Sequence, residues 1–218
     1  FRHLDDEAYT DACVDDLTQV FDMMTSGDVA AMIAEPIQGV GGFATPPDGF
    51  FGAMKKELDN RGVLFISDEV QTGWGRTGEN FWGYQAHGMT PDLLTFAKGV
   101  GNGLALGGVV AGADLMDSLP GNSLSTFGGN PMSSVGALAT IRYMLKHDIQ
   151  GHALAMGERL AGHLQLAVDA SSVVAELRGK GLMLAIETVQ AGSLEPNTDA
   201  ASRIMEEARA AGLLIGKG

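Results

Sequence analysis

Two short apolar runs, each followed by charged residues, constrain the fold of this chain more than any other feature. The first, at 63–66, is followed by the acid pair Asp68 and Glu69, and the second, at 93–97, ends at Lys98. Short runs of this kind, bounded by turn residues, are typical of buried parallel strands. Since ligands bind beyond the carboxyl ends of such strands, we expect the acid and the lysine to face one crevice.

The segments around these runs predict an α/β fold. An apolar run at 29–34 stops at Glu35 and Pro36, and a helix over 49–60 returns the chain to the strand at 63–66. This order forms a βαβ unit, which crosses over right-handed. Other strands are expected at 108–111, 173–176 and 181–189, and other helices at 11–24, 132–146, 151–170 and 200–211. We predict a mostly parallel sheet flanked by helices.

Lys98 and Asp68 provide the side-chain chemistry that a pyridoxal phosphate (PLP) enzyme needs. Desolvation beside apolar sequence turns a lysine amine into a nucleophile, and a nearby acid can hold a protonated pyridine nitrogen. The alternative is a solvated surface lysine and a turn or capping acid, which are the usual positions of these residue types.

Five sequence blocks, in order along the chain, carry a family resemblance. ISDEVQTGWGRTG at 66–78 and PDLLTFAKGVGNG at 91–103 resemble the signature of the class III (subgroup II) aminotransferases, PLP enzymes of fold type I. AEPIQGVGG at 34–42, STFGGNP at 125–131 and LRGKGLMLAIE at 177–187 are similar to further blocks of that family. Within that family, the residues of these blocks are most similar to those of the alanine–glyoxylate and β-amino acid:pyruvate branch.

The resemblance implies a role for each residue of the first two blocks that would contact PLP. Lys98 matches the lysine that forms a Schiff base with PLP and then transfers a proton. Asp68 would pair with the pyridinium nitrogen, Val70 would pack on the ring face, and Gln71 would hydrogen-bond the phenolic oxygen. Glu69 belongs to the signature, but we expect no contact from it.

Three further residues would bind phosphate and substrate. Thr126 matches the residue that reaches the PLP phosphate of the neighbouring subunit, which implies a homodimer with shared active sites. Arg178 matches the arginine that grips a substrate carboxylate with its planar guanidinium. Glu35 matches the acid that pairs with that arginine, so one pocket would accept two substrates. Their alternatives are a helix-capping hydroxyl, a surface salt bridge and a strand-end acid.

The resemblance implies a ping-pong transaminase. It would move an amino group from an ω- or β-amino acid, or from an alanine-like one, to a 2-oxo acid or aldehyde. Alternatives are an aminomutase or decarboxylase with the same fold, and a truncated scaffold without catalysis. A dinucleotide site at 99–103 is a poorer alternative, because the spacing is not GxGxxG and a strand-like run follows at 108–111.

Composition argues against several other classes of partner and site. The formal net charge of −13 argues against nucleic acid or an anionic membrane as a partner. Cys13 is the only cysteine, and the five histidines show no metal-ligand spacing, so we expect no disulfide and no metal. No apolar run approaches the roughly 20 residues of a membrane helix. We expect a cytoplasmic protein, or a mitochondrial-matrix protein in a eukaryote.

Compared with the fold of the family that it resembles, the chain is expected to comprise parts of two domains. Residues 1–150 would belong to the large PLP-binding domain and 151–218 to a small α+β C-terminal domain. An N-terminal portion, which carries the phosphate-cradling turn and the aromatic residue stacked on the ring, and the C-terminal end are expected to be absent. The glycine-spaced loop at 71–78 is suited to covering a cleft.

Overall fold

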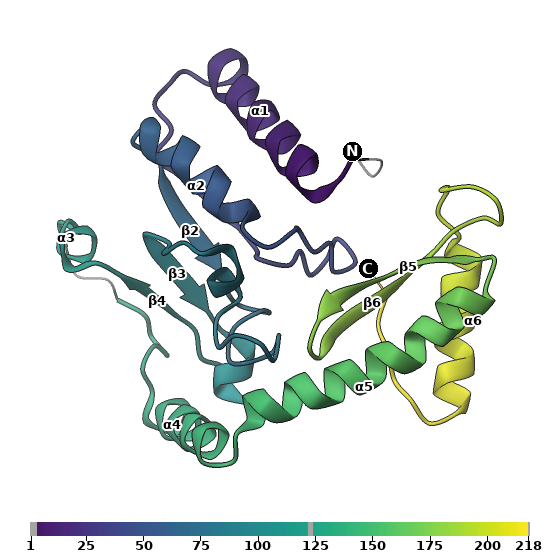
Figure 1. The fold of residues 1–218 in the computed structure, drawn as a ribbon. Coiled ribbons are helices and arrows are strands. Elements are labelled where there is room, and N and C mark those ends of the chain that lie inside the picture. The colour runs from purple at the N-terminus through teal and green to yellow at the C-terminus, as the bar shows by residue number, and fades with distance from the viewer. Residues whose placement is uncertain (1–3, 122–123, 218) are drawn as a thin grey trace.

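The computed structural model describes residues 4–121 and 124–217, and a four-stranded sheet organises it. The strands are, in order across the sheet, β1 (Ala31–Ala34), β2 (Leu64–Asp68), β3 (Leu93–Phe96) and β4 (Gly108–Ala111). The first three run parallel, and β4 pairs antiparallel with β3 (Figure 1). The predicted α/β class and the mostly parallel sheet are therefore confirmed.

Two helices build the core on this sheet. Helix α2 (Phe50–Asn60) connects β1 to β2 and packs on β2, and α1 (Asp6–Met24) packs on α2 (Figure 1). Leu58 of α2 and Phe65 of β2 are almost fully buried in this core. Burial of each side chain stabilises the fold by about 2 kcal/mol. The other buried members of this core are Phe50, Phe51, Met54 and Val63.

Helix α1 begins earlier than the predicted start at residue 11. Asp5 caps it, because its Oδ1 accepts the N–H of Ala8 at 2.9 Å. The first turn is acidic, which stabilises a helix N-terminus. The predicted start at residue 11 was therefore too late, and it left out Tyr9, which packs on the core at the same spacing as Cys13 and Leu17.

A second, smaller sheet lies beyond a long helix. Helices α4 (Pro131–Lys146) and α5 (Ile149–Ala170) lead to the antiparallel hairpin β5 (Val174–Lys180) and β6 (Met183–Thr188), and α6 (Thr198–Ala210) packs on β6 (Figure 1). The short helices are α3 (Ala113–Met116), η1 (Gly83–His87) and η2 (Lys98–Gly101). Among the described residues, no helix combines the length and apolar character that crossing a membrane requires.

Strand β5 is longer than the strand predicted at 173–176. It continues through Arg178 to Lys180, which pair with Ala185 and Met183 of β6. Both basic side chains are held by acidic partners. An apolar pattern does not reveal such pairing, and the prediction therefore ended the strand too early.

Candidate active site

The carboxyl ends of β2 and β3 bring the predicted acid and lysine to one edge of the sheet. Asp68 is the last residue of β2 and pairs with Thr95 of β3. The Glu69 N–H extends this pairing by donating to the Thr95 carbonyl at 2.9 Å. β3 ends at Phe96, and Lys98 opens η2 just beyond it. Because the strands run parallel, Asp68 and Lys98 lie at the edge where ligands bind in such sheets.

The backbone at Lys98 is strained. Its φ is +44°, in the left-handed region, which costs a residue with a side chain roughly 1–2 kcal/mol. Two neighbouring residues hold this turn in place. Val100 is buried, and Gly99 faces the ring of Trp74. A Cβ added at Gly99 would lie 3.7 Å from Trp74 Cδ1. The Lys98 side chain is exposed, so a ligand can reach its amine. Strained positions of this kind cluster at functional sites.

The turn after β2 and the loop after β1 form one hydrogen-bonded unit at this edge. Asp68 is half-buried, and its Oδ1 accepts the N–H of Val70 at 3.1 Å. Gln71 Nε2 donates to Glu35 Oε2 at 3.4 Å, and the same oxygen accepts the N–H of Gly39 at 3.0 Å. The fit is close, since a Cβ at Gly39 would lie 1.6 Å from Gln71 Nε2. A larger residue at this position would displace the Gln71 amide from its contact with Glu35.

Arg178 reaches the same loop from β5. Its Nε donates to the carbonyl of Gly42 at 2.7 Å. Its Nη1 lies 3.4 Å from Glu176 Oε2 and 3.6 Å from Glu187 Oε2. In the part of the chain that the structure describes, no ion pair joins Arg178 to Glu35. Both residues nevertheless bind one loop, at Gly42 and at Gly39 respectively.

Glu69 has a role that the sequence reasoning missed. Its carboxylate is fully buried and accepts four hydrogen bonds. Two come from the hydroxyls of Ser67 and Thr72, at 3.1 and 2.6 Å, and two from the N–H groups of Gly83 and Tyr84, at 2.7 and 2.8 Å. These contacts fasten η1 to the turn after β2. The local signal was an acid directly after a buried strand with a threonine three positions on.

Thr126 is exposed, in the loop before α4. Asn130 caps that helix by accepting the N–H of Ser133 at 3.0 Å, so the cap is an amide and not one of the loop hydroxyls. Within the described residues, no hydrogen bond involves the Thr126 side chain.

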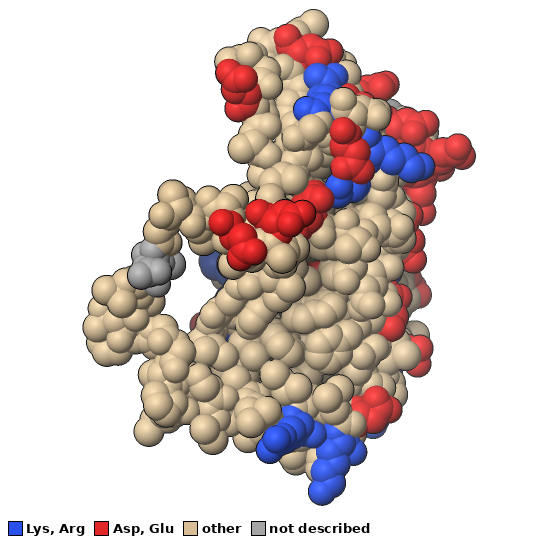
Figure 2. Space-filling view, turned by 90° about the vertical axis from the view of Figure 1, so that its left-hand side faces the viewer, with Lys and Arg blue, Asp and Glu red and all other residues tan. Residues whose placement is uncertain are grey.

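The side of the molecule that carries α3, β4 and α4 shows a broad area without charge (Figure 2). Its exposed apolar residues include Val109, Val110, Met132, Val135 and Leu138.

The glycine-spaced loop at 71–78 packs against α5 at Gly75 and Gly78. A Cβ at Gly75 would lie 3.0 Å from Gln150 Cβ, and one at Gly78 would lie 2.6 Å from Leu154 Cα. The glycines thus allow close approach to α5, and a role of the loop in covering a cleft stays a prediction. Trp74 of this loop packs edge to face against three rings, those of Phe81, Trp82 and Phe96.

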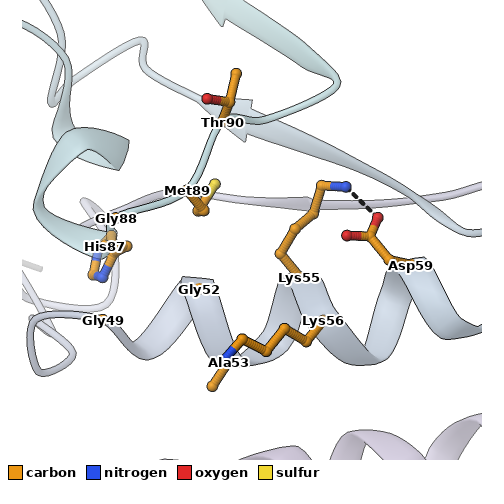
Figure 3. Close-up of a pocket in the computed structure, with 10 residues that line it drawn as sticks. All are labelled: Gly49, Gly52, Ala53, Lys55, Lys56, Asp59, His87, Gly88, Met89 and Thr90. Atoms are coloured by element: carbon orange, nitrogen blue, oxygen red, sulfur yellow. Dashed lines mark hydrogen bonds and ion pairs between the residues drawn. The ribbon is translucent and has the colours of Figure 1, made fainter.

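A separate cavity of about 520 Å³ lies between α2 and residues 87–90 (Figure 3). Lys55 in its wall pairs with Asp59 and, at 3.1 Å, with Asp92. Burial lowers the pKa of His87 to about 4, so this imidazole is neutral at pH 7.

The residues predicted from the motifs lie outside this cavity, and we place the candidate site at the sheet edge. Among the described side chains, no cluster of His, Cys, Asp and Glu could hold a metal ion.

Comparison with known proteins finds relatives along almost the whole chain. The family described as aminotransferase class-III matches residues 2–218. The mitochondrial alanine–glyoxylate aminotransferase 2 homolog 2 of Arabidopsis thaliana is 40% identical over 205 residues, which cover 93% of this chain and 43% of that protein. An alanine/serine racemase of Pyrococcus horikoshii is 37% identical over 188 residues, 86% of this chain and 39% of that protein.

A solved structure supports the same relationship. The (S)-enantioselective ω-transaminase from Thermomicrobium roseum superposes with a TM-score of 0.90 at 34% identity. The match covers 99% of this chain and 50% of that one. The chain therefore spans half or less of the length of these relatives.

Proposed function

The chain belongs to the class III aminotransferases, PLP-dependent enzymes of fold type I, and from this premise we propose that the protein is a transaminase. It takes an amino group from an alanine-like, β- or ω-amino acid and transfers it to a 2-oxo acid or aldehyde by a ping-pong mechanism. One observation carries the proposal: Asp68 and Lys98 lie together at the carboxyl edge of parallel β2 and β3.

The side chains at this edge fit the chemistry of PLP. When bound, PLP supplies an electron-accepting ring that stabilises negative charge at the substrate Cα. Asp68 offers a carboxylate to keep the ring nitrogen protonated, Val70 an apolar contact for the ring face, and Gln71 an amide for the phenolic oxygen. Lys98 is the proposed Schiff-base lysine, and its exposed amine moves the proton between Cα and C4′.

Arg178 is the proposed partner of the substrate carboxylate. Its Nε stays on the Gly42 carbonyl, while its contact with Glu187, at 3.6 Å, is long enough to be exchanged for a carboxylate. Glu35 is the proposed second partner of Arg178 when the substrate brings no carboxylate to this position. That exchange would require Glu35 to leave Gln71, to which it is now hydrogen-bonded.

The proposed enzyme is a homodimer with shared active sites. Thr126 is exposed in its loop, near a broad uncharged face, and is available to the phosphate of PLP held by a second subunit. Residues 1–150 and 151–218 are the proposed parts of the large and small domains. The single cysteine is compatible with a reducing compartment, and we propose the cytoplasm, or the mitochondrial matrix given the names of some relatives.

The racemase among the relatives favours testing one rival, a PLP enzyme that uses the same residues without an amino acceptor. The two differ in what the amino donor leaves behind. A transaminase converts its cofactor to pyridoxamine phosphate and then needs an external 2-oxo acid, whereas a racemase, aminomutase or decarboxylase regenerates PLP in each cycle. Spectroscopic detection of pyridoxamine phosphate after addition of an amino donor alone separates them.

Borohydride reduction of the complete protein with PLP, followed by peptide mapping, tests the cofactor and the lysine together. We expect a reduced pyridoxyl group on Lys98 and none in a Lys98→Ala variant that folds normally. A pyridoxyl group on another lysine would refute the assignment of Lys98. A well-folded complete protein without any adduct would refute the proposed function.

A further inference from the structure

Trp74, in the glycine-spaced loop, has two features that are unfavourable in a folded chain. Its φ is +63°, a left-handed conformation that is rare for a bulky side chain. Its indole Nε1 is buried, and no described residue accepts a hydrogen bond from it. Features of this kind persist only where the surrounding structure holds them, and they cluster at functional sites. The contacts of Trp74 therefore indicate what the residue does.

Hydrogen bonds fix the backbone on both sides of Trp74. The N–H of Gly73 donates to the carbonyl of Glu69, and the N–H of Gly75 donates to the carbonyl of Phe81, each at 3.0 Å. Glu69 is itself held by the four hydrogen bonds of its buried carboxylate. The left-handed conformation of Trp74 is thus imposed by anchored neighbours, and it sets the direction of the ring.

The ring of Trp74 lies against the chain on both sides of Lys98. It packs edge to face on Phe96, the last residue of β3, with centroids 5.4 Å apart. The Phe96 ring also rests on β4, since a Cβ at Gly108 would lie 2.6 Å from Phe96 Cζ. After Lys98, a Cβ at Gly99 would lie 3.7 Å from Cδ1 of Trp74 and 3.9 Å from its Cβ. The turn that carries Lys98 is therefore bounded by this ring.

Lys98 needs such a restraint because its own φ is +44°. A residue with a side chain relaxes to a negative φ unless its neighbours prevent it. That relaxation would turn the Cα–Cβ bond of Lys98 and redirect its amine. In the part of the chain that the structure describes, five residues other than glycine have a positive φ, and two of them, Trp74 and Lys98, are connected through Phe96. The strained loop thus supports the strained turn.

We propose that Trp74 is a positioning residue for Lys98, whose ring packs on Phe96 and holds the left-handed turn from which the Lys98 amine reaches PLP. The inference rests on the proposed role of Lys98, in which its amine condenses with the aldehyde of PLP and releases one water molecule. Trp74 acts through the backbone and touches neither cofactor nor substrate. Its ring acts by packing, because its N–H has no partner among the described residues. Its loss therefore weakens PLP retention only when the Lys98 amine is present.

A double-mutant cycle in the complete protein tests this coupling. Equilibrium dialysis gives the dissociation constant of PLP for the unchanged protein, for Trp74→Ala, for Lys98→Ala and for the double variant. We expect Trp74→Ala to weaken PLP binding about tenfold when Lys98 is present, and less than about twofold in the Lys98→Ala background. This measurement is independent of turnover and of substrate.

Three further variants make the cycle interpretable. Trp74→Phe keeps the Cβ and Cδ1 atoms that face Gly99 and loses only the unpartnered N–H and part of the ring, so it should retain PLP within about twofold of the unchanged protein. Phe50→Ala removes a buried ring that packs on Phe51 in the α2 core, and it should also leave PLP affinity within about twofold. If Trp74→Ala does not fold, Phe96→Leu removes the same ring contact from the other side and should show the same coupling to Lys98.

The cycle separates failure of the inference from failure of the proposed function. Equal losses of PLP affinity with and without the Lys98 amine would refute the positioning role, since a general structural defect gives that result. No loss in either background would also refute it, and the role of Lys98 would stand. A loss in Trp74→Phe as large as that in Trp74→Ala would overturn packing as the cause. If Lys98→Ala binds PLP as tightly as the unchanged protein, the proposed role of Lys98 fails, and the inference fails with it.

Discussion

Glu69 is the residue that most clearly organises the candidate site without facing it. Each of its two oxygens accepts one hydroxyl and one backbone N–H, and the carboxylate is fully buried. In Glu69→Gln, whichever oxygen becomes an amide NH₂ faces the N–H of Gly83 or Tyr84, and two donors cannot bond to each other. We expect the free energy of unfolding, measured by urea denaturation, to fall by roughly 2–4 kcal/mol.

Glu206→Gln on α6 is the matched control for that change. Glu206 is an exposed acid paired with Arg209 in the same helix, and exposed pairs contribute little. Its substitution should alter the free energy of unfolding by less than about 0.5 kcal/mol. Similar losses in the two variants would mean that the four hydrogen bonds of Glu69 do not matter to stability.

The lowered pKa of His87 predicts that part of the free energy of unfolding is lost as the pH falls. Burial lowers its pKa from an ordinary 6.5 to about 4 in the folded protein, and contacts with Asp48 and Lys180 modify this less. Between these values the unfolded chain binds the proton more readily, so stability falls as the pH drops from about 6.5 and levels off below about 4. Between pH 7.5 and 5 this amounts to roughly 2 kcal/mol.

The comparison protein for this titration is His87→Phe, which keeps a ring against Phe51 and cannot titrate. The two rings of the unchanged protein meet edge to face, with centroids 4.9 Å apart. Urea unfolding at pH 7.5 and at pH 5 should show a smaller loss in His87→Phe, because the other titrating groups are common to both proteins. Parallel pH dependence in the two proteins would rule out His87 as the source.

At the scale of elements, periodic apolar patterns predicted where most helices and strands lie, but not where charged residues set their ends. Helix α2 and strand β3 agree with prediction within a residue or two at each end. Helix α1 starts earlier because Asp5 caps it, and β5 runs on to Lys180 because acids on distant loops satisfy its charge. Packing brings such partners together from distant segments. The apolar pattern along one segment therefore cannot predict them.

The packing of the glycine-spaced loop on α5 gives a prediction for this scale. Gly78 has a φ of +77°, and a Cβ there would lie 2.6 Å from the Leu154 backbone. Gly62 has a similar φ of +68° but open space around it. Both Gly→Ala variants incur the left-handed cost of roughly 1–2 kcal/mol, and only Gly78→Ala adds the collision, for a total of about 3 kcal/mol or more.

Urea unfolding of the two variants measures the difference. A larger loss in Gly78→Ala assigns the glycine to helix packing. If both variants lose the same free energy, backbone conformation alone explains the glycine, and the loop has room to move on α5.

Across the whole molecule, the candidate site draws on segments that lie far apart in the sequence. Glu35 follows β1, Asp68 ends β2, Lys98 follows β3, and Arg178 lies on the hairpin beyond α5. The sequence predicted these residues as two pairs, Asp68 with Lys98 from their positions at strand ends and from family resemblance, and Glu35 with Arg178 from resemblance alone. The motifs did not predict that Glu35 contacts Gln71, since that contact depends on how two loops meet at the sheet edge.

The proposed sharing of sites between two subunits predicts complementation. Lys98→Ala abolishes the amine, and Thr126→Ala removes a hydroxyl–phosphate hydrogen bond, which should weaken PLP retention roughly tenfold or more. If Thr126 serves the neighbouring subunit, a mixed dimer of the two variants contains one site with both defects and one intact site. Half of randomly mixed dimers are mixed, so activity at limiting PLP should recover to about one quarter of the unchanged protein.

The controls are the two variant dimers alone, which should be inactive or nearly so at limiting PLP. Co-purification of an untagged variant with an affinity-tagged one confirms that subunits have exchanged. If Thr126 instead served its own subunit, each mixed dimer would hold one site without the lysine and one without the hydroxyl. The activity after mixing would then equal the average of the separate variants, and the site would be complete within one subunit.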